Sequence, residues 1–144
     1  DLILPQGVGL EIEKGTTLEM AKGTKIIIRK APIKIKGTKE MPVKMLSHSR
    51  ELKEGWSGIR VLNSPEKSFI NYLELKHING NINSDPYITG AITLYESDVQ
   101  IDHSTFEDIN IDFVDVLLFV RAKNDGAEVL SFDKDFKRLE KLVG

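Results

Sequence analysis

The sequence predicts a mainly β protein that ends in a short αβα unit, and three observations predict it. From residue 2 to residue 110, apolar and polar residues alternate over short segments separated by Gly, Pro or Lys-Gly. Successive segments begin about eight residues apart, which leaves no room for helices between them. After residue 110 the spacing of apolar residues changes to the period of a helix.

Five strands are expected between the N-terminus and Ser47. Their apolar positions are Leu10 and Ile12, Leu18 and Met20, Ile26 and Ile28, Ile33 and Ile35, and Val43 and Met45. Alternation with a period of two puts each pair on one face of its strand. We therefore expect strands of about three to five residues, each with one buried face, that turn repeatedly in one compact β structure.

Two longer segments recur in the second half of the chain. GIRVL at 58–62 returns as GAITL at 90–94, an offset of 32, and LKHIN at 75–79 returns as FEDIN at 106–110, an offset of 31. A repeat of this period predicts stacked units that bury their apolar faces against one another. Stacking would place Ile78 on Ile109 inside the structure and Asn79 on Asn110 at a bend.

These segments resemble a known kind of repeat. The stretches LEIEKGTTLEMAKGTKIIIRKAPIKIKGTKEMPVKM, GWSGIRVLN and SDVQIDHSTFEDIN are similar to the right-handed parallel β-helix repeats of bacterial surface and secreted proteins. The resemblance implies a right-handed parallel β-helix, or solenoid, over residues 1–110. It also implies an extracellular or cell-surface location, with a polysaccharide or a protein surface as partner. Such folds host lyases, adhesins and passive scaffolds, so the function has to be argued from a site.

The segment after residue 110 is expected to be helix, strand and helix. Its apolar residues Phe113, Val116, Leu117 and Val120 have helical spacing, Asp112 suits a helix start and Gly126 suits a C-terminal cap. AEVLSF at 127–132 is typical of a buried strand, and DFKRLEKLV at 135–143 of an amphipathic helix. We expect this αβα unit, residues 111–144, to cap the last apolar layer of the repeats.

Residues 111–139, IDFVDVLLFVRAKNDGAEVLSFDKDFKRL, resemble the C-terminal part of PIN domains, a family of metal-dependent ribonucleases. The resemblance lies in Asp115, followed by apolar residues, and in Asp133 within SFDKDF. It implies that Asp115 and Asp133, with Asp135 as a third candidate, bind Mg²⁺ or Mn²⁺. It also implies RNA as substrate and a cytoplasmic location. Of the four acids that a PIN nuclease uses, only Asp115 and Asp133 can be placed.

Element lengths support pairing these two carboxylates. A helix of about 12 residues is roughly 18 Å long, and a return strand of about five residues spans roughly 17 Å. Chain reversal would then bring Asp133 back beside Asp115, where two acids can hold Mg²⁺ and activate water. The alternative is that Asp115 favours a helix N-terminus, while Asp133 or Asp135 caps the last helix. The sequence leaves both interpretations open.

The function predicted is a non-enzymatic β-solenoid scaffold or ligand-binding module, joined near residue 110 to the PIN-like segment as a fusion. The scaffold needs no cofactor. The alternative is a Mg²⁺-dependent ribonuclease with Asp115 and Asp133 as catalytic metal ligands. The chain has no cysteine, which excludes disulfides and thiolate zinc sites. No apolar run approaches the roughly 18 residues of a membrane span, so none is expected.

Overall fold

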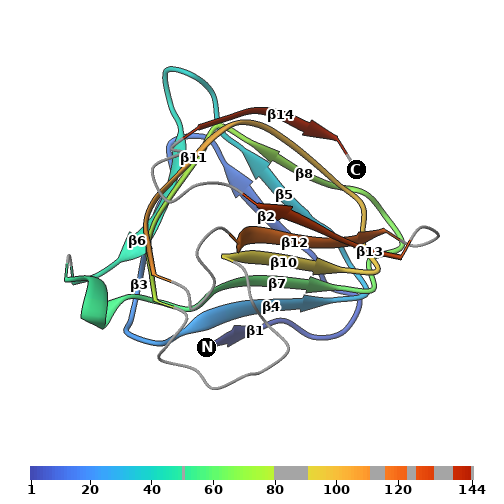
Figure 1. Ribbon diagram of the computed structural model, residues 1–144, viewed down its shortest axis with the longest axis horizontal. Helices are drawn as coiled ribbons and strands as arrows, with labels where there is room; N and C mark the ends of the chain where they lie inside the picture. The colour runs from blue at the N-terminus through green and yellow to red at the C-terminus, as the bar shows by residue number, and fades with distance from the viewer. Residues whose placement is uncertain (50, 80–90, 111–115, 123–125, 132–137, 144) are drawn as a thin grey trace.

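The computed structural model describes residues 1–49, 51–79, 91–110, 116–122, 126–131 and 138–143, which form a mainly β structure (Figure 1). A 3-10 turn, Leu52–Glu54, is the one helical element among them. The strands are β1 Leu2–Ile3, β2 Leu10–Glu13, β3 Thr17–Met20, β4 Lys25–Arg29, β5 Ile33–Lys36, β6 Val43–Ser47, β7 Gly58–Leu62, β8 Ser68–Asn71, β9 Leu73–Asn79, β10 Ile92–Tyr95, β11 Val99–Asn110, β12 Val116–Ala122, β13 Gly126–Ser131 and β14 Arg138–Val143.

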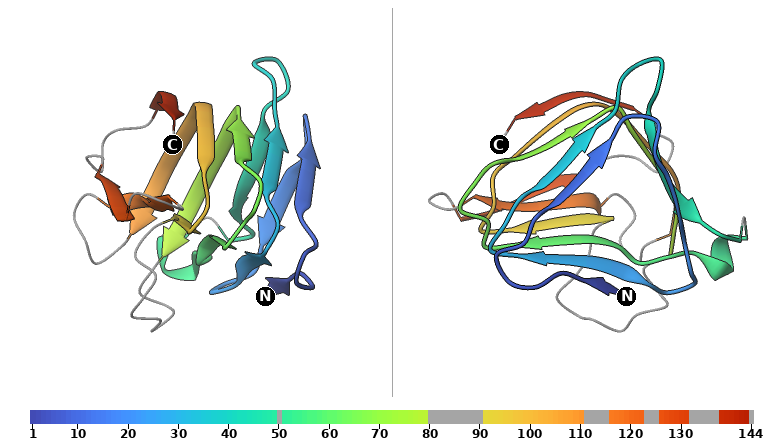
Figure 2. Two further views of the ribbon diagram at one scale, coloured as in Figure 1. Left: turned by 90° about the vertical axis from the view of Figure 1, so that its right-hand side faces the viewer. Right: turned by 180° about the vertical axis from the view of Figure 1, so that it is seen from behind.

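The described strands form two sheets of mainly parallel strands. Sheet A has the order β1-β4-β7-β10-β12-β13, and sheet B has the order β2-β5-β8-β11-β9-β6-β3, with β14 on β11. From β1 to β8 each strand pairs in parallel with the strand three places later, so that three strands complete one turn of the chain, and β9 pairs with β11. The two views of Figure 2 show these turns side by side. The mainly β prediction is therefore confirmed.

Sheet B is curled because one strand crosses both of its halves. The first part of β11, Val99–Asp102, pairs with β8, and its second part, Thr105–Asn110, pairs with β9. Between the two parts, His103 has a φ of 50°, which bends the strand. The curled sheet faces sheet A across the core in Figure 1.

The core consists of apolar residues stacked from one turn to the next. In sheet A, Ile26, Ile59 and Ile92 share one register position and are fully buried. In sheet B, Ile35, Ile70 and Ile101 do the same. The alternation that predicted the first strands is confirmed in β4 and β5, where every second residue is buried; in β6 Val43 and Met45 are buried as expected, and Leu46 is buried as well. Stacking identical side chains in this way buries most of each inner face.

The corners after the sheet A strands share one backbone conformation. Left-handed residues occupy this corner in three successive turns: Lys30, Asn63 and Glu96, with φ of 54°, 54° and 48°. At the first two of these corners the backbone N–H bonds to the next turn: Lys30 N donates to Leu62 O and Asn63 N donates to Tyr95 O, both at 2.8 Å. The corner ladder therefore satisfies backbone groups that the strands leave unpaired.

The expected repeat is confirmed in one place and wrong by one residue in the other. In sheet B, Leu75 pairs with Phe106 and Ile78 with Ile109, as the offset of 31 predicts. In sheet A, Ile59 pairs with Ile92 rather than with Ala91, so the offset is 33 and not 32. The pairing of two large apolar residues prevails because a one-residue slip would turn the core side chains outward.

The prediction of an αβα unit is wrong for the residues after 110 that the structure describes, because these residues form strands. Val116–Ala122 is a strand, β12, that pairs in parallel with β10, and Arg138–Val143 is a strand, β14, that pairs antiparallel with β11. Gly126 begins β13 rather than capping a helix. The strand expected at 127–132 corresponds to β13, which pairs antiparallel with β12. The free edges of β10 and β11 offer backbone groups that a strand can pair and a helix cannot.

Candidate functional site

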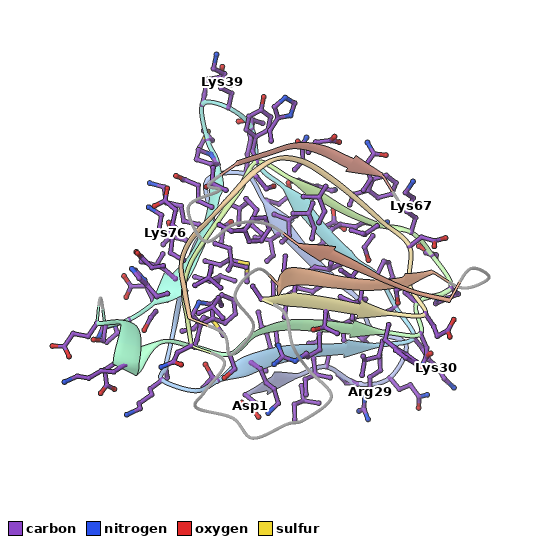
Figure 3. The ribbon with its side chains drawn as sticks, in the orientation of Figure 1. Asp1, Arg29, Lys30, Lys39, Lys67 and Lys76 are labelled. Carbon is purple, nitrogen blue, oxygen red and sulfur yellow. The ribbon has the colours of Figure 1, made fainter. Side chains whose placement is uncertain are left out.

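The outer face of sheet B carries two adjacent hollows over β3, β6, β9 and the second part of β11, which we call the outer groove. One hollow, of about 270 Å³, is lined by Thr17, Glu19, Lys44, Leu46, Glu74 and Lys76. The other, of about 290 Å³, is lined by Lys39, Pro42, Tyr72, Glu74, His103 and Thr105. Glu74 lines both, so the two hollows lie next to each other. Figure 3 shows Lys76 on this face and Lys39 at the tip of the loop above it.

An aromatic pair stands at one end of the outer groove. The rings of Tyr72 and His103 are stacked, with centroids 4.6 Å apart and planes within 4° of parallel. Both residues have left-handed backbones, with φ of 49° and 50°, and occupy equivalent corners of successive turns. Tyr72 N donates to Asp102 O at 3.1 Å, which fixes the two corners together. The turns of the chain thus build a rigid, half-buried aromatic step at the rim of the groove.

The rest of the groove presents charged groups of both signs. Lys44 and Glu74 are opposite each other on β6 and β9, and Lys76 Nζ lies 3.4 Å from Glu107 Oε2. Leu46 is buried among them. The hollow over β3, β6 and β9 therefore offers ammonium donors and carboxylate acceptors in alternation, whereas the lining of the other hollow is largely apolar.

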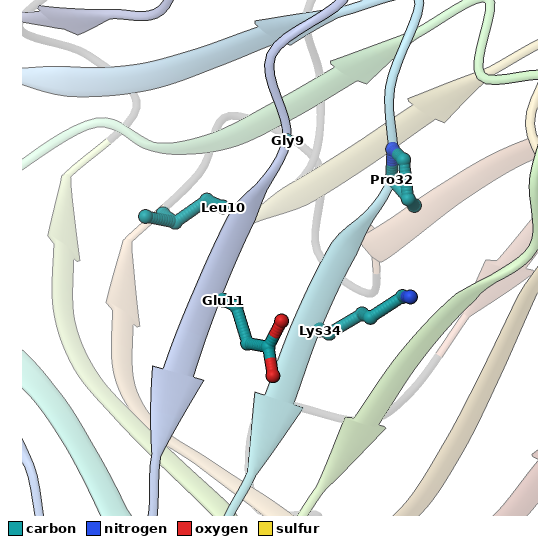
Figure 4. Close-up of a pocket in the computed structure, with 5 residues that line it drawn as sticks. All are labelled: Gly9, Leu10, Glu11, Pro32 and Lys34. Atoms are coloured by element: carbon teal, nitrogen blue, oxygen red, sulfur yellow. The ribbon is translucent and has the colours of Figure 1, made fainter.

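A second charged cluster lies on β2 and β5, where Glu11 and Glu13 face Lys34 and Lys36. The register pairs Glu11 with Lys34 and Glu13 with Lys36. Lys36 bonds to Glu11 and also lies 3.7 Å from Glu13. Glu11 and Lys34 line a shallow hollow of about 240 Å³ together with Gly9, Leu10 and Pro32 (Figure 4). We call this cluster, on the first strand of its row, the β2 edge.

The ion pair at the β2 edge shifts the pKa of both partners. The hydrogen bond from Lys36, and then its charge, lowers the pKa of Glu11 below the ordinary value, with a smaller effect from Lys34. The hydrogen bond to Glu11 raises the pKa of Lys36. Because the folded pKa of Glu11 is lowered, the stabilisation is present above the unfolded pKa of Glu and is lost as the pH falls through the folded pKa.

We expect Lys36→Gln to raise the pKa of Glu11 toward its ordinary value, because the variant removes the largest cause of the shift. Lys34→Gln is the matched control, and it should raise that pKa by less. Titration of the Glu11 side-chain carboxyl by carbon NMR measures both changes. An equal or larger effect of Lys34→Gln would contradict the assignment of the main partner.

The metal site predicted from the sequence lies outside the described residues. Asp115, Asp133 and Asp135 all belong to the parts of the chain that the structure leaves undescribed. Where residues are described, no three His, Asp or Glu side chains are grouped so that they could hold a metal ion. The described part also contains no helix with the length and apolar character needed to cross a membrane. Metal binding by the three aspartates stays a prediction.

Sequence reasoning missed the Tyr72–His103 pair, although a signal for it was present. The same offset that pairs LKHIN with FEDIN also aligns Tyr72 with His103. Extending the repeat by a few positions toward the N-terminus would have placed both rings at one corner.

No protein-family model matches the sequence, and neither the curated proteins nor the solved structures give a significant match.

Proposed function

We propose that this chain is a non-enzymatic β-solenoid module, right-handed in its winding, whose outer groove binds a polysaccharide. The observation that carries the proposal is the stacked Tyr72–His103 pair at the rim of a groove lined by charged and hydroxyl groups. Aromatic rings beside a few polar groups are typical of sites that bind small organic ligands. The parallel turns support a solenoid because each strand row repeats one turn later.

The chemistry of the groove favours a sugar chain over a protein surface. A specific protein interface buries about 800 Å² on each partner around an apolar centre. In the outer groove Leu46 is buried, and the apolar surface of the second hollow is confined to Pro42 and the aromatic pair, which is far smaller than such a centre. Sugars instead present hydroxyl groups that bond to carboxylates and ammonium groups, as Glu74 and Lys44 provide. Their C–H faces can pack on the exposed side of the aromatic step.

We expect Tyr72→Ala to weaken polysaccharide binding by about tenfold, because the variant removes one ring of the step, a loss of about 1.4 kcal/mol. Affinity electrophoresis against a panel of neutral and acidic polysaccharides measures the effect. Tyr95→Ala is the matched control, since Tyr95 is an exposed tyrosine that lines neither hollow of the outer groove. It should leave the affinity unchanged. No retardation of the parent protein by any polysaccharide, or equal losses in both variants, would overturn the proposal.

The same preparation tests the ribonuclease alternative. The described residues nearest in sequence to Asp115 and Asp133 are Val116 and Ser131, and these two pair across β12 and β13. Cleavage of single-stranded RNA that requires Mg²⁺ or Mn²⁺, and that Asp133→Asn abolishes, would replace the binding module with a PIN-type nuclease. Polysaccharide binding without such cleavage would support the module.

A further inference from the structure

A third hollow lies at the ends of β3 and β6, next to the outer groove. Its volume is about 400 Å³, and it is lined by Glu19, Ala21, Lys22, His48, Ser49 and Glu54. Apart from Glu19, these residues follow β3 or β6 or belong to the 3-10 turn at that corner (Figure 1), so we call it the corner hollow. Because Glu19 also lines the hollow over β3, β6 and β9, the two hollows lie next to each other.

The three hollows follow one another along the strands. The hollow beside Tyr72 and His103 lies where β6 and β9 begin, the next lies over the middle of β6, and the corner hollow lies where β6 ends. Since β3, β6 and β9 are parallel, these positions form a row. From Pro42 at one end to His48 at the other, the row spans the length of about six residues of strand, or about 20 Å.

Polar contacts connect successive turns around the corner hollow. His48 Nδ1 lies 3.0 Å from Glu19 Oε2, and Lys22 Nζ lies 3.4 Å from Glu54 Oε1. Ser47 Oγ donates to Glu54 O at 2.8 Å, which holds the 3-10 turn against the end of β6. The lining of the corner hollow is otherwise largely apolar, as it is in the hollow beside the aromatic pair. Two apolar-lined hollows thus flank one that is charged.

The middle of the row offers a donor and an acceptor side by side. Lys44 and Glu74 are opposite each other on β6 and β9. Neither of them takes part in an ion pair with another side chain that the structure describes. The ammonium group can therefore donate to a ligand oxygen while the carboxylate accepts from a ligand hydroxyl group.

Positive and negative side chains balance along the row. The three hollows are lined by four lysines, which are Lys22, Lys39, Lys44 and Lys76, and by three glutamates, which are Glu19, Glu54 and Glu74. Glu107, 3.4 Å from Lys76 Nζ, is the fourth acid. Four charges of each sign leave no excess that would attract a polyanion or a polycation.

We propose that the corner hollow is a further binding subsite, and that the whole row binds one chain of an uncharged, linear polysaccharide that lies along the strands of sheet B. This inference rests on the proposed polysaccharide-binding function. The apolar-lined hollows at the two ends would receive the C–H faces of sugar rings, while Lys44 and Glu74 bind hydroxyl groups between them. A hydroxyl group can both donate and accept, whereas a charged chain would be repelled by half of the charged side chains in the row.

Oligosaccharides of increasing length test whether the hollows act together. The probes are neutral β-1,4-linked oligosaccharides of glucose, mannose and xylose, because this linkage keeps the chain extended. We expect isothermal titration calorimetry to show an affinity that rises at least about tenfold from the shortest binder to a chain of about 20 Å, and no further. Equal affinity at all lengths, or no binding of any neutral oligosaccharide, would overturn the inference.

His48→Ala locates the added subsite. It should lower the affinity for the longest oligosaccharide about threefold and leave the affinity for the shortest binder unchanged, whereas Tyr72→Ala should lower both. Lys53→Ala is the matched control, because Lys53 is exposed in the same segment but lines none of the three hollows. An effect of His48→Ala no larger than that of Lys53→Ala would contradict a subsite in the corner hollow.

The charge of the preferred polymer separates this inference from the proposed function. Surface plasmon resonance would compare immobilised hydroxyethyl cellulose with alginate and polygalacturonate. We expect the neutral polymer to bind more tightly, with less than about a twofold change in affinity between about 50 and about 500 mM salt. Tighter binding of an acidic polymer, weakened by salt and by Lys44→Gln, would overturn the inference and leave the proposed function standing. Binding of no polysaccharide at all would overturn both.

Discussion

Trp56→Ala is expected to lower the free energy of unfolding by about 3–5 kcal/mol, the range found for removing a buried aromatic side chain. Trp56 is fully buried, and its backbone bridges to Ile78 in the next part of the chain. Its indole N–H donates to the carbonyl of Lys76 at 2.8 Å. The variant would leave a cavity between two turns and an unpaired carbonyl at its wall.

Urea denaturation of three variants separates these contributions. Trp56→Phe keeps most of the volume but loses the N–H donor, so it should cost less than Trp56→Ala. Phe69→Ala removes an aromatic residue that is 45% exposed and should change the stability by less than about 0.5 kcal/mol. If Trp56→Ala is as mild as Phe69→Ala, Trp56 does not hold the two turns together.

Gly58→Ala is expected to cost about 3 kcal/mol or more, through strain and overlap together. Gly58 has a φ of 88°, which side chains rarely adopt, and a Cβ at this position would overlap the carbonyl oxygen of Ala91. That oxygen accepts a hydrogen bond from Ile59 N at 3.0 Å, in the middle of sheet A. Relief of the overlap would therefore separate β7 from the next turn.

Gly7→Ala is the matched control for this substitution. Gly7 has almost the same φ, 87°, but a Cβ there would meet no atom within 4 Å. Its cost should be the backbone strain alone, about 1–2 kcal/mol. Thermal unfolding followed by circular dichroism compares the two variants. Equal losses would show that strain, and not the contact with Ala91, explains the effect.

The strands of the first two turns could be predicted from the sequence because one signal dominates there. Alternating residues such as Ile33 and Ile35 bury one face, and glycine or proline ends each segment. The two-residue alternation and the glycine or proline residues between segments then indicate the same strand boundaries, and such agreement makes a local prediction reliable. The register of sheet A could not be predicted from the repeat alone. The segments GIRVL and GAITL can be aligned almost equally well with an offset of 32 or of 33 residues. The buried partner of Ile59 decides it.

The C-terminal segments could not be predicted because their apolar residues fit two periods. VLLFV at 116–120 has helical spacing with its neighbours, but it is also a continuous apolar run, as in a strand buried on both faces. RLEKLV at 138–143 is similarly ambiguous. These segments become strands because β10 and β11 offer backbone N–H and C=O groups that β12 and β14 pair with. The local sequence does not reveal that those groups are there.

Only part of the candidate site could be predicted from the sequence, because its residues come together through strand register. Tyr72 and His103 are one repeat apart in the sequence, and their stacking depends on the registers of both β8 and β9 with β11. No local motif marks either residue. The charged pairs of the β2 edge were visible in the letters LEIE and IKIK, but only the parallel register shows that carboxylates and lysines face each other. The division into two domains near residue 110 stays a prediction.

The left-handed corners also determine where the length of this chain is free to change. From β4 to β7 the paired residues are 33 apart, as with Ile26 and Ile59, while from β6 to β9 they are 30 apart, as with Val43 and Leu73. The loops absorb these differences, and the strands do not. One residue inserted within Lys25–Arg29 would turn Ile26 and Ile28 outward, whereas an insertion of one whole turn would add a layer about 4.8 Å thick that presents the same edges. Descendants of such a chain can therefore grow by whole layers and vary at their corners, while the residue count inside each strand stays fixed.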